Sequence, residues 1–523
     1  MSSGRAVAEA ARRRTFAIIS HPDAGKTTLT EKLLLYGGAI DLAGAVRAKD
    51  GGSHARSDWM EIERQRGISV TSAALRFEHR GHVLNLLDTP GHRDFSEDTY
   101  RVLTATDTAV MVIDAAKGLE PQTLKLFQVC RTRGTPIITF VNKLDRPARD
   151  ILELLDEIER EIGMRPTPVT WPVLHEGVFL GIVDRRDATF IPYDRPVHGA
   201  SAGEQEPVPL AAADLPPAAR ATLADDLDLL DGVGADHDPA GFAAGVTTPV
   251  FFGSALGNCG VRQLLEAVEG IGLPPAGWDT TDGGVRALDD PFCGVVFKVQ
   301  ANTDPRHRDR IAYLRVCSGR FERTLAARHE RTGKPVGLSY AHQPFGRDRI
   351  PVEEAFPGDV IGLVNATGLR PGDVVHDGPA VRFAPMPRFA AEHFAVARSR
   401  DSRRYKQFQR GLGELDEEGV VQVLRHRDRG DQSPVLAAVG PMQLEVAKAR
   451  LEGEFGAPTE IDPPRRMIAR ETDEEGAKVL ARVGVEVLAR RSGELVALFR
   501  SPMHVAGIEK DYPEVRLEAL LAG

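Results

Sequence analysis

Short apolar segments, each followed by a loop of small and charged residues, recur along the first half of the chain. They occur at residues 16–19, 83–87, 109–113, 136–141 and 250–253. Short apolar runs bounded by turn-forming residues are typical of strands buried on both faces. A helical spacing of Leu29 and Leu33 follows the first run. This alternation predicts an α/β domain with a mostly parallel sheet.

The loop after the first apolar run ends in Gly25-Lys26-Thr27 and leads into the helical pattern. A strand, a tight loop and a helix in this order form a triphosphate site, in which backbone N–H groups face the phosphates, the Lys reaches the outer phosphates and the Thr holds magnesium. Ser20 opens the loop where Gly is usual. An ordinary strand-to-helix turn with an exposed Lys26 is the alternative. The predicted phosphate-binding residues are Ser20, His21, Pro22, Asp23, Ala24, Gly25, Lys26, Thr27 and Thr28.

A second loop with phosphate chemistry follows residues 83–87. It contains Asp88-Thr89-Pro90-Gly91-His92. A carboxylate at the tip of a strand beside the phosphate loop can hold the magnesium shell through water, and Gly91 lets the backbone approach a third phosphate. We therefore add Asp88, Thr89, Pro90 and Gly91 to the predicted phosphate-binding residues, and Thr27 and Asp88 to the predicted magnesium site.

The loop after residues 136–141 indicates which base is bound. It reads Asn142-Lys143-Leu144-Asp145. A carboxylate at Asp145 can accept two hydrogen bonds from the ring N–H and exocyclic amine of guanine, while Asn142 bonds N7 and the stem of Lys143 packs along the ring. The N–H groups of Ser254, Ala255 and Leu256 could bond the guanine O6. Because ligands of parallel α/β sheets bind at the carboxyl ends of the strands, these loops in this order predict a GTPase.

A GTPase also needs a hydroxyl that completes magnesium coordination only when the third phosphate is present. Ser69 is the candidate for this role, and Thr71 is a weaker one on the same side of an extended segment. A strand hydroxyl with no metal role is the alternative for Ser69.

Three of these motifs resemble the signatures of translational GTPases. They are Arg66-Gly67-Ile68-Ser69, the segment from Asp88 to His92, and the segment from Asn142 to Asp145. The resemblance implies that His92 positions the attacking water, that Pro22 and Ile68 form an apolar gate beside it, and that Asp23 stabilises the loop. The family usually has Thr where this chain has Ser69.

Further segments resemble the class-II release factors of bacterial translation termination. They are residues 20–28, 54–60, 94–100, 248–258 and 304–310. The likeness runs from about Arg14 to the final segment and weakens after about Ile461. It implies that GTP/GDP and Mg²⁺ are bound, that ribosomes (rRNA and ribosomal proteins) activate hydrolysis, and that class-I peptide chain release factors are removed from the ribosome and recycled after peptide release. It also implies a monomer away from the ribosome.

The composition adds limits to this interpretation. The chain has 523 residues, 42% of them hydrophobic and 27% charged, and no apolar run nears the roughly 18 residues of a membrane helix. We expect a cytoplasmic protein without a membrane partner, whose four scattered cysteines are free thiols. The net charge of −9 does not favour a nucleic-acid partner, but a ribosome binder needs only local basic faces. Residues 1–14 carry consecutive arginines and are expected to be a disordered lead-in.

The chain divides into three predicted domains. Residues 12–278 form the P-loop GTPase domain, with a surface insertion at about 181–246 that is helical near 219–230 and otherwise loop. Short strands with Pro-Gly turns predict a translation-factor-like β-barrel at 286–386. Residues 387–523 form a C-terminal α+β domain. Its helix at 443–455 carries one apolar face, made of Leu444, Ala447, Leu451 and Phe455.

Two other functions remain open from the sequence. An elongation-like or antibiotic-protection GTPase is disfavoured by the short C-terminal half and the Ser20-His21-Pro22 opening. A scaffold that binds GTP without hydrolysing it is disfavoured by His92, and phosphate release would separate it from a GTPase.

Overall fold

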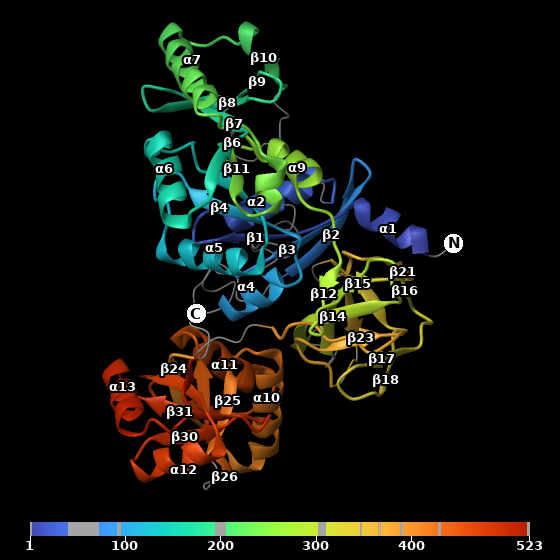
Figure 1. Cartoon of the computed structure of the whole chain (residues 1–523), viewed down its shortest axis with the longest axis vertical. Helices are drawn as coiled ribbons and strands as arrows, with labels where there is room; N and C mark the ends of the chain where they lie inside the picture. The colour runs from blue at the N-terminus through green and yellow to red at the C-terminus, as the bar shows by residue number, and fades with distance from the viewer. Residues whose placement is uncertain are drawn as a thin grey trace.

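The computed structural model describes residues 3–39, 73–90, 96–193, 206–301, 310–345, 348–364, 366, 368–386, 391–426 and 430–519. Within these ranges no helix is both long and apolar enough to cross a lipid bilayer. Three parts of the chain are visible in Figure 1: a GTPase domain in blue to green, a smaller β domain in yellow, and an α+β domain in orange to red.

The GTPase domain is built on a mostly parallel sheet, as predicted. Its parallel strands are, in spatial order, β3 (His82–Asp88), β1 (Arg13–Ser20), β4 (Thr108–Asp114), β5 (Ile137–Asn142), β11 (Thr247–Phe252) and β6 (Arg165–Pro168). β2 (Ala73–His79) joins the edge antiparallel to β3. The parallel register brings the polar residues that follow β1, β3, β4, β5 and β11 to one edge of the sheet.

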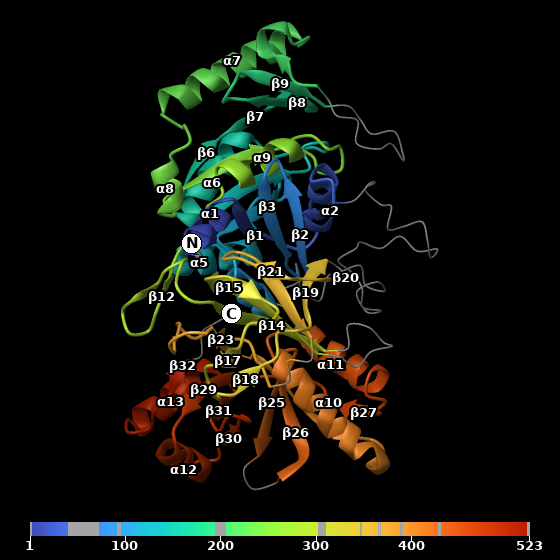
Figure 2. The same cartoon turned by 90° about the vertical axis from the view of Figure 1, so that its right-hand side faces the viewer.

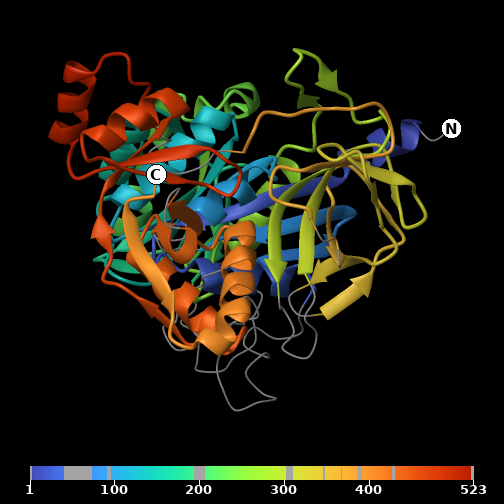
Figure 3. The ribbon, with the colours of Figure 1, turned by 90° about the horizontal axis from the view of Figure 1, so that it is seen from below.

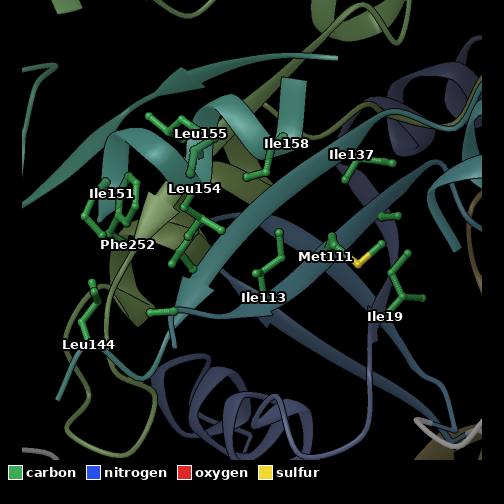
Figure 4. Close-up of a cluster of buried hydrophobic side chains, with 14 of the residues drawn as sticks. Ile19, Met111, Ile113, Ile137, Leu144, Ile151, Leu154, Leu155, Ile158 and Phe252 are labelled. Carbon is green, nitrogen blue, oxygen red and sulfur yellow. The ribbon is translucent and has the colours of Figure 1, made fainter. Parts of the chain in front are cut away.

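Helices cover both faces of this sheet. α2 (Lys26–Tyr36) and α9 (Val261–Gly270) lie on one face, and α4 (Ser96–Leu103), α5 (Pro121–Arg133) and α6 (Ile151–Ile162) lie on the other. Successive residues of β1 alternate between the two cores, Phe16 and Ile18 on the α2 side and Ala17 and Ile19 on the α5 side. Figure 4 shows the second core, where α6 packs on the strands. Burial on both faces fixes the strands that carry the loops.

The predicted insertion is more regular than expected. α7 (Pro217–Gly232) confirms the helix near 219–230. The expectation of loop elsewhere is wrong, because β7 (Thr170–His175), β8 (Val178–Asp184), β9 (Thr189–Pro192) and β10 (Val208–Pro209) form an antiparallel sheet, followed by η3 (Leu210–Ala212). α8 (Pro239–Ala243) packs instead on β11 of the parallel sheet. The partner strand β7 lies before the predicted insertion, and it supplies Trp171, which pairs with Val183 in the buried core.

The second domain is a curled antiparallel sheet of barrel type, as predicted. Its strands are β14 (Cys293–Ala301), β15 (Arg310–Ser318), β16 (Phe321–Glu322), β17 (Ala327–His329), β18 (Pro335–Val336), β19 (Ala341–Phe345), β20 (Asp348–Pro351), β21 (Glu354–Ala355), β22 (Val360–Val364) and β23 (Val374–His376). The linker before it holds the short pair β12 (Trp278–Asp279) and β13 (Val285–Arg286). Phe345 of β19 pairs with Leu75 of β2, so the two domains share one continuous sheet.

The C-terminal domain is α+β, as predicted, and a single sheet runs through it. Its strands are β24 (His393–Ser399), β25 (Gln422–His426), β26 (Gly430–Ala438), β27 (Thr459–Ile461), β28 (Arg465–Arg466), β29 (Ile468–Thr472), β30 (Glu486–Ala489), β31 (Leu495–Phe499) and β32 (Glu518–Ala519). Its helices are η4 (Ser402–Arg404), α10 (Tyr405–Glu418), α11 (Pro441–Gly453), α12 (Glu474–Arg482) and α13 (Pro502–Asp511). Leu444, Ala447 and Leu451 of α11 are buried in one cluster, as predicted for one face of the helix. The predicted end of the helix is wrong, because α11 stops at Gly453 and Phe455 packs on the same cluster from beyond the helix. Figure 3 shows α10 beside the barrel.

A helix near the N-terminus corrects the expected disordered lead-in. α1 (Ser3–Ala11) buries Ala6 and Ala10, and Arg5 forms an ion pair with Glu354 of the barrel at 2.8 Å. Figure 2 shows α1 and β21 at the seam between the GTPase domain and the barrel. The sequence of α1 does not show this role, because its partners come from the barrel.

Buried polar contacts hold the same seam. Arg315 of β15 is 1% exposed and donates two hydrogen bonds to the carboxylate of Asp107, each 2.8 Å. The hydroxyl of Thr15 in β1 donates to the carbonyl of Gly358 at 2.6 Å. The GTPase domain is therefore packed against the barrel along the ends of β1 and β4.

Candidate functional site

The predicted phosphate loop leaves β1 at Ser20 and enters α2 at Lys26. Its turn requires Gly25, whose φ is +96° and whose added Cβ would overlap Asn142 Nδ2. The Ser20 hydroxyl donates within the loop to the carbonyl of His21 at 2.9 Å. The N-terminus of α2 therefore points into the space that this loop encloses, which suits an anion.

Lys26 and Asp88 meet at the bottom of the loop. The Lys26 Nζ lies 2.6 Å from Asp88 Oδ1, and both side chains are almost fully buried. The Thr89 hydroxyl donates to the Ile18 carbonyl at 2.8 Å, which fixes the end of β3 against β1. A buried lysine and a buried carboxylate side by side place a positive charge for phosphates next to oxygen ligands for a divalent cation.

Asn142 joins the phosphate loop to the loop after β11. Its Nδ2 donates to the Ala24 carbonyl at 2.8 Å, and its Oδ1 accepts from the Ala255 N–H at 2.9 Å. Because Asn142 is only 2% exposed, both hydrogen bonds are shielded from water. Three predicted loops are thus held together by one amide.

Lys143 fixes the other side of the phosphate loop. Its φ is +70°, and its Nζ donates to the Asp23 carbonyl and, at 2.9 Å, to Asp114 Oδ2. Burial by itself raises the pKa of Asp114, but hydrogen bonds from Lys143 and the Ala116 amide outweigh it and hold that pKa below its usual value. Asp114 is therefore ionised at neutral pH and orients Lys143. In the sequence Asp114 directly follows the apolar run 109–113, but that position alone predicts no role for it.

Asp145, predicted to read the base, is positioned by the loop after β11. The Ser254 hydroxyl donates to Asp145 Oδ1 at 2.5 Å and accepts from the Gly257 N–H at 3.1 Å. The side chain of Leu256 is 56% exposed, so only its backbone is suited to the predicted contact with guanine. One carboxylate oxygen is thus anchored in a fixed direction.

His21 contacts a residue that the sequence did not point to. Its imidazole is fully buried, and Nδ1 lies 2.9 Å from a carboxylate oxygen of Glu120, the residue before α5. The atoms are close without hydrogen-bond alignment, so the contact is electrostatic. Burial lowers the pKa of His21, and Glu120 opposes this effect. Nothing in the local sequence of Glu120 signals the contact, because it depends on the fold.

Several predicted residues lie outside the described part of the chain. These are Ser69 and its alternative Thr71, Ile68, Gly91 and His92, and most of residues 304–310. Among the described residues, no group of three or more His, Cys, Asp or Glu side chains is placed to hold a metal. The oxygen donors of Thr27 and Asp88 are the kind that Mg²⁺ prefers when phosphates and water complete its shell. All roles in nucleotide and metal binding stay predictions.

Comparisons with known proteins agree with this architecture. The family model "Elongation factor Tu GTP binding domain" matches residues 11–272, "Elongation factor G domain 2" matches 291–378, and "Class II release factor RF3, C-terminal domain" matches 383–509. A crystal structure of a protein from Thermus thermophilus superposes with a TM-score of 0.70 at 26% identity, covering 88% of this chain and 68% of that one.

Relatives along nearly the full chain carry one name. "Peptide chain release factor 3" of Synechococcus elongatus is 48% identical, covering 97% of this chain and 93% of its own. The protein of the same name from Gloeobacter violaceus is 46% identical, covering 99% of both. With the matching GTP-binding domain, these relatives show a translational GTPase, an enzyme that binds guanine nucleotides and hydrolyses GTP. The chain belongs to the family of peptide chain release factor 3, the class-II release factors.

Proposed function

We propose that this GTPase promotes the dissociation and recycling of class-I peptide chain release factors from the ribosome after peptide release. The observation that carries the proposal is the match of residues 383–509 to the C-terminal domain of class-II release factors, joined to a GTP-binding domain. A GTP-binding domain alone would suit any translational GTPase. The C-terminal match is what favours termination.

We propose that GTP lies along the edge formed by the loops after β1, β3, β5 and β11. Lys26 and the loop N–H groups would neutralise the outer phosphates. Asp145, held by Ser254, would accept hydrogen bonds from guanine, and Asn142 would bond N7. The described residues of these loops already contact one another, which supports this placement.

The predicted metal would be Mg²⁺, with Thr27 and Ser69 as hydroxyl ligands and Asp88 acting through water. When bound, it would neutralise charge on the phosphates during transfer to water. The protein's own side chains would hold the groups that surround the metal in position. Lys26 pairs with Asp88, and Thr89 fixes the strand end that carries Asp88.

We further propose that His92 orients the attacking water and that Pro22 and Ile68 form an apolar gate beside it. Pro22 is half-buried and follows the fully buried His21 in the loop, which supports a position beside the phosphates. Hydrolysis would be slow in isolation and fast on the ribosome, because contact with ribosomal RNA and proteins would bring His92 into position.

Three expectations about location and assembly accompany this function. We propose a cytoplasmic protein that is monomeric away from the ribosome and has no membrane partner. The four buried free cysteines support a reducing compartment. We also propose domain boundaries at 12–278, 286–386 and 387–523, which the three matched family ranges support.

The decisive experiment measures multiple-turnover phosphate release from GTP with and without ribosomes. In parallel, the departure of a fluorescent class-I factor from a stop-codon complex is followed after peptide release. We expect ribosomes to stimulate turnover and the protein with GTP to speed departure. Stimulated turnover without faster departure would point to another translational GTPase. Unstimulated turnover would reject a ribosomal role.

A further inference from the structure

Helix α4 is fixed to the end of the strand that carries Asp88. The Thr99 hydroxyl in α4 donates to the Pro90 carbonyl at 3.2 Å, and Thr99 is buried. Gly91 and His92, the residues proposed to sense the third phosphate and orient water, lie in the chain between Pro90 and α4. A change at the nucleotide that moves this part of the chain would therefore move α4 as well.

The other end of α4 touches the C-terminal domain. Arg101 donates to the Glu418 carbonyl at the end of α10 at 3.1 Å, and to the Glu97 carboxylate one turn earlier in α4. The next residue, Gly419, has φ of +78°, and an added Cβ would overlap Arg101 Nη1. The guanidinium thus occupies space that exists only because residue 419 has no side chain. Figure 1 shows α4 on the side of the GTPase domain that faces the C-terminal domain.

The end of α10 is also tied to its own domain. The Glu418 carboxylate pairs with Arg450 of α11 at 2.7 Å, and both side chains are buried. Burial opposes the charge of Arg450, yet Glu418 and Glu454 hold its pKa above the usual value. A displacement of Glu418 would therefore also displace α11, because the paired side chains are buried and closely packed.

The barrel meets the same two helices. Glu417, beside Glu418, pairs with Arg310 of β15 and, at 2.9 Å, with Arg491 near β30. Asp98 of α4 lies 3.4 Å from Lys298 of β14. All three domains therefore meet where α4 approaches the end of α10.

We infer that the contact of Arg101 with the Glu418–Gly419 end of α10 transmits the position of α4, and with it the nucleotide state, to the C-terminal domain. Arg101 is a coupling residue, distinct from those proposed to bind or hydrolyse GTP. The inference rests on the proposed function for its biological output, but the transmission itself can be measured without release factors.

The test uses Gly419→Ala, which leaves every charge of the junction in place but puts a methyl group where the guanidinium lies. Gly456→Ala is the matched control, because Gly456 lies in the same domain, has φ of +59° and has nothing within 4 Å of an added Cβ. It carries the backbone strain of a left-handed alanine without the clash. Arg101→Gln is the second variant, in case Gly419→Ala does not fold.

The readout is energy transfer between dyes at Val178→Cys on β8 and Met503→Cys on α13, which are 60% and 85% exposed. The four native cysteines are buried and will not label. We expect the unaltered protein and Gly456→Ala to change transfer efficiency between GDP and a non-hydrolysable GTP analogue. Gly419→Ala and Arg101→Gln should lose this change while keeping GDP affinity and ribosome-free hydrolysis.

Three results would overturn the inference: no nucleotide-dependent change in the unaltered protein, a full change in both junction variants, or an equal loss in Gly456→Ala. Class-I factor departure is then measured with the same proteins, and we expect it to slow about tenfold in the junction variants, within the range of typical allosteric couplings. If the dyes report transmission but even the unaltered protein does not speed departure, the proposed function fails and the inference stands.

Discussion

Replacing Asn142 by alanine should loosen guanine nucleotide binding by an amount that the structure sets. The change removes two buried hydrogen bonds, one to the Ala24 carbonyl and one from the Ala255 N–H. Each contributes about 0.5–1.5 kcal/mol net, so together they contribute about 1–3 kcal/mol. If this free energy holds the loops in their binding arrangement, GDP and GTP affinity falls about 5- to 150-fold.

Asn142→Asp refines the test. Aspartate keeps the oxygen that accepts from Ala255 but turns the donor toward Ala24 into an oxygen, which would repel the Ala24 carbonyl. We therefore expect a greater loss for Asn142→Asp than for Asn142→Ala, although aspartate has nearly the shape of asparagine. A purely steric role for the side chain would give the opposite order.

The assay is titration with a fluorescent GDP and displacement by GTP, with urea unfolding to verify that each variant is folded. Gln128→Ala, which removes an exposed amide from α5, is the control and should bind normally. The reasoning is refuted if folded Asn142→Ala binds GDP within about twofold of the unaltered protein, a difference below about 0.4 kcal/mol. The three loops would then be held by other contacts.

Four further predictions concern other parts of the molecule. Asp145→Asn should reduce the preference for GTP over other nucleoside triphosphates in a competition assay, since an amide cannot accept both guanine hydrogen bonds; unchanged selectivity would count against this role. His92→Ala should bind GTP normally but lose most ribosome-stimulated phosphate release, and near-normal turnover would rule out its proposed function. Arg315→Ala leaves Asp107 without its buried partner and should cost about 3–5 kcal/mol of unfolding free energy in urea, most of it recovered with Asp107→Asn. Burial raises the pKa of three native thiols to about 12, so at about pH 8.5, where a free thiol is half ionised, iodoacetamide should modify them only after unfolding.

The arrangement of the predicted nucleotide-binding loops could be predicted because its signals are local. A strand, a glycine-containing loop and a helix follow one another within residues 16–33, so this short segment is enough to predict all three. The apolar strands that lead to Asp88 and Asn142 were equally clear. Since parallel strands end at one edge, the order of the motifs was enough to expect that they meet.

The parts that were missed depend on partners far away in the chain. Glu120 lies against His21 only because α5 packs beside β1. The antiparallel sheet of β7 to β10 contradicts the expectation of loop, because its first strand, with Trp171, lies before the predicted insertion. In the sequence Gly419 is an ordinary helix-ending glycine. Only the fold shows that Arg101 lies where a side chain at this position would be.

The position of α1 has a consequence for the way the protein is made. Arg5 and its partner Glu354 are 349 residues apart. At the usual pace of about 5–20 residues per second, the ribosome needs roughly 17 to 70 s between making one and making the other. The hydrogen bond from Thr15 to Gly358 can form only after almost as long a delay, because Gly358 is 343 residues away. The predicted nucleotide-binding loops are therefore synthesised well before the contacts that join Arg5 and Thr15 to the barrel can form.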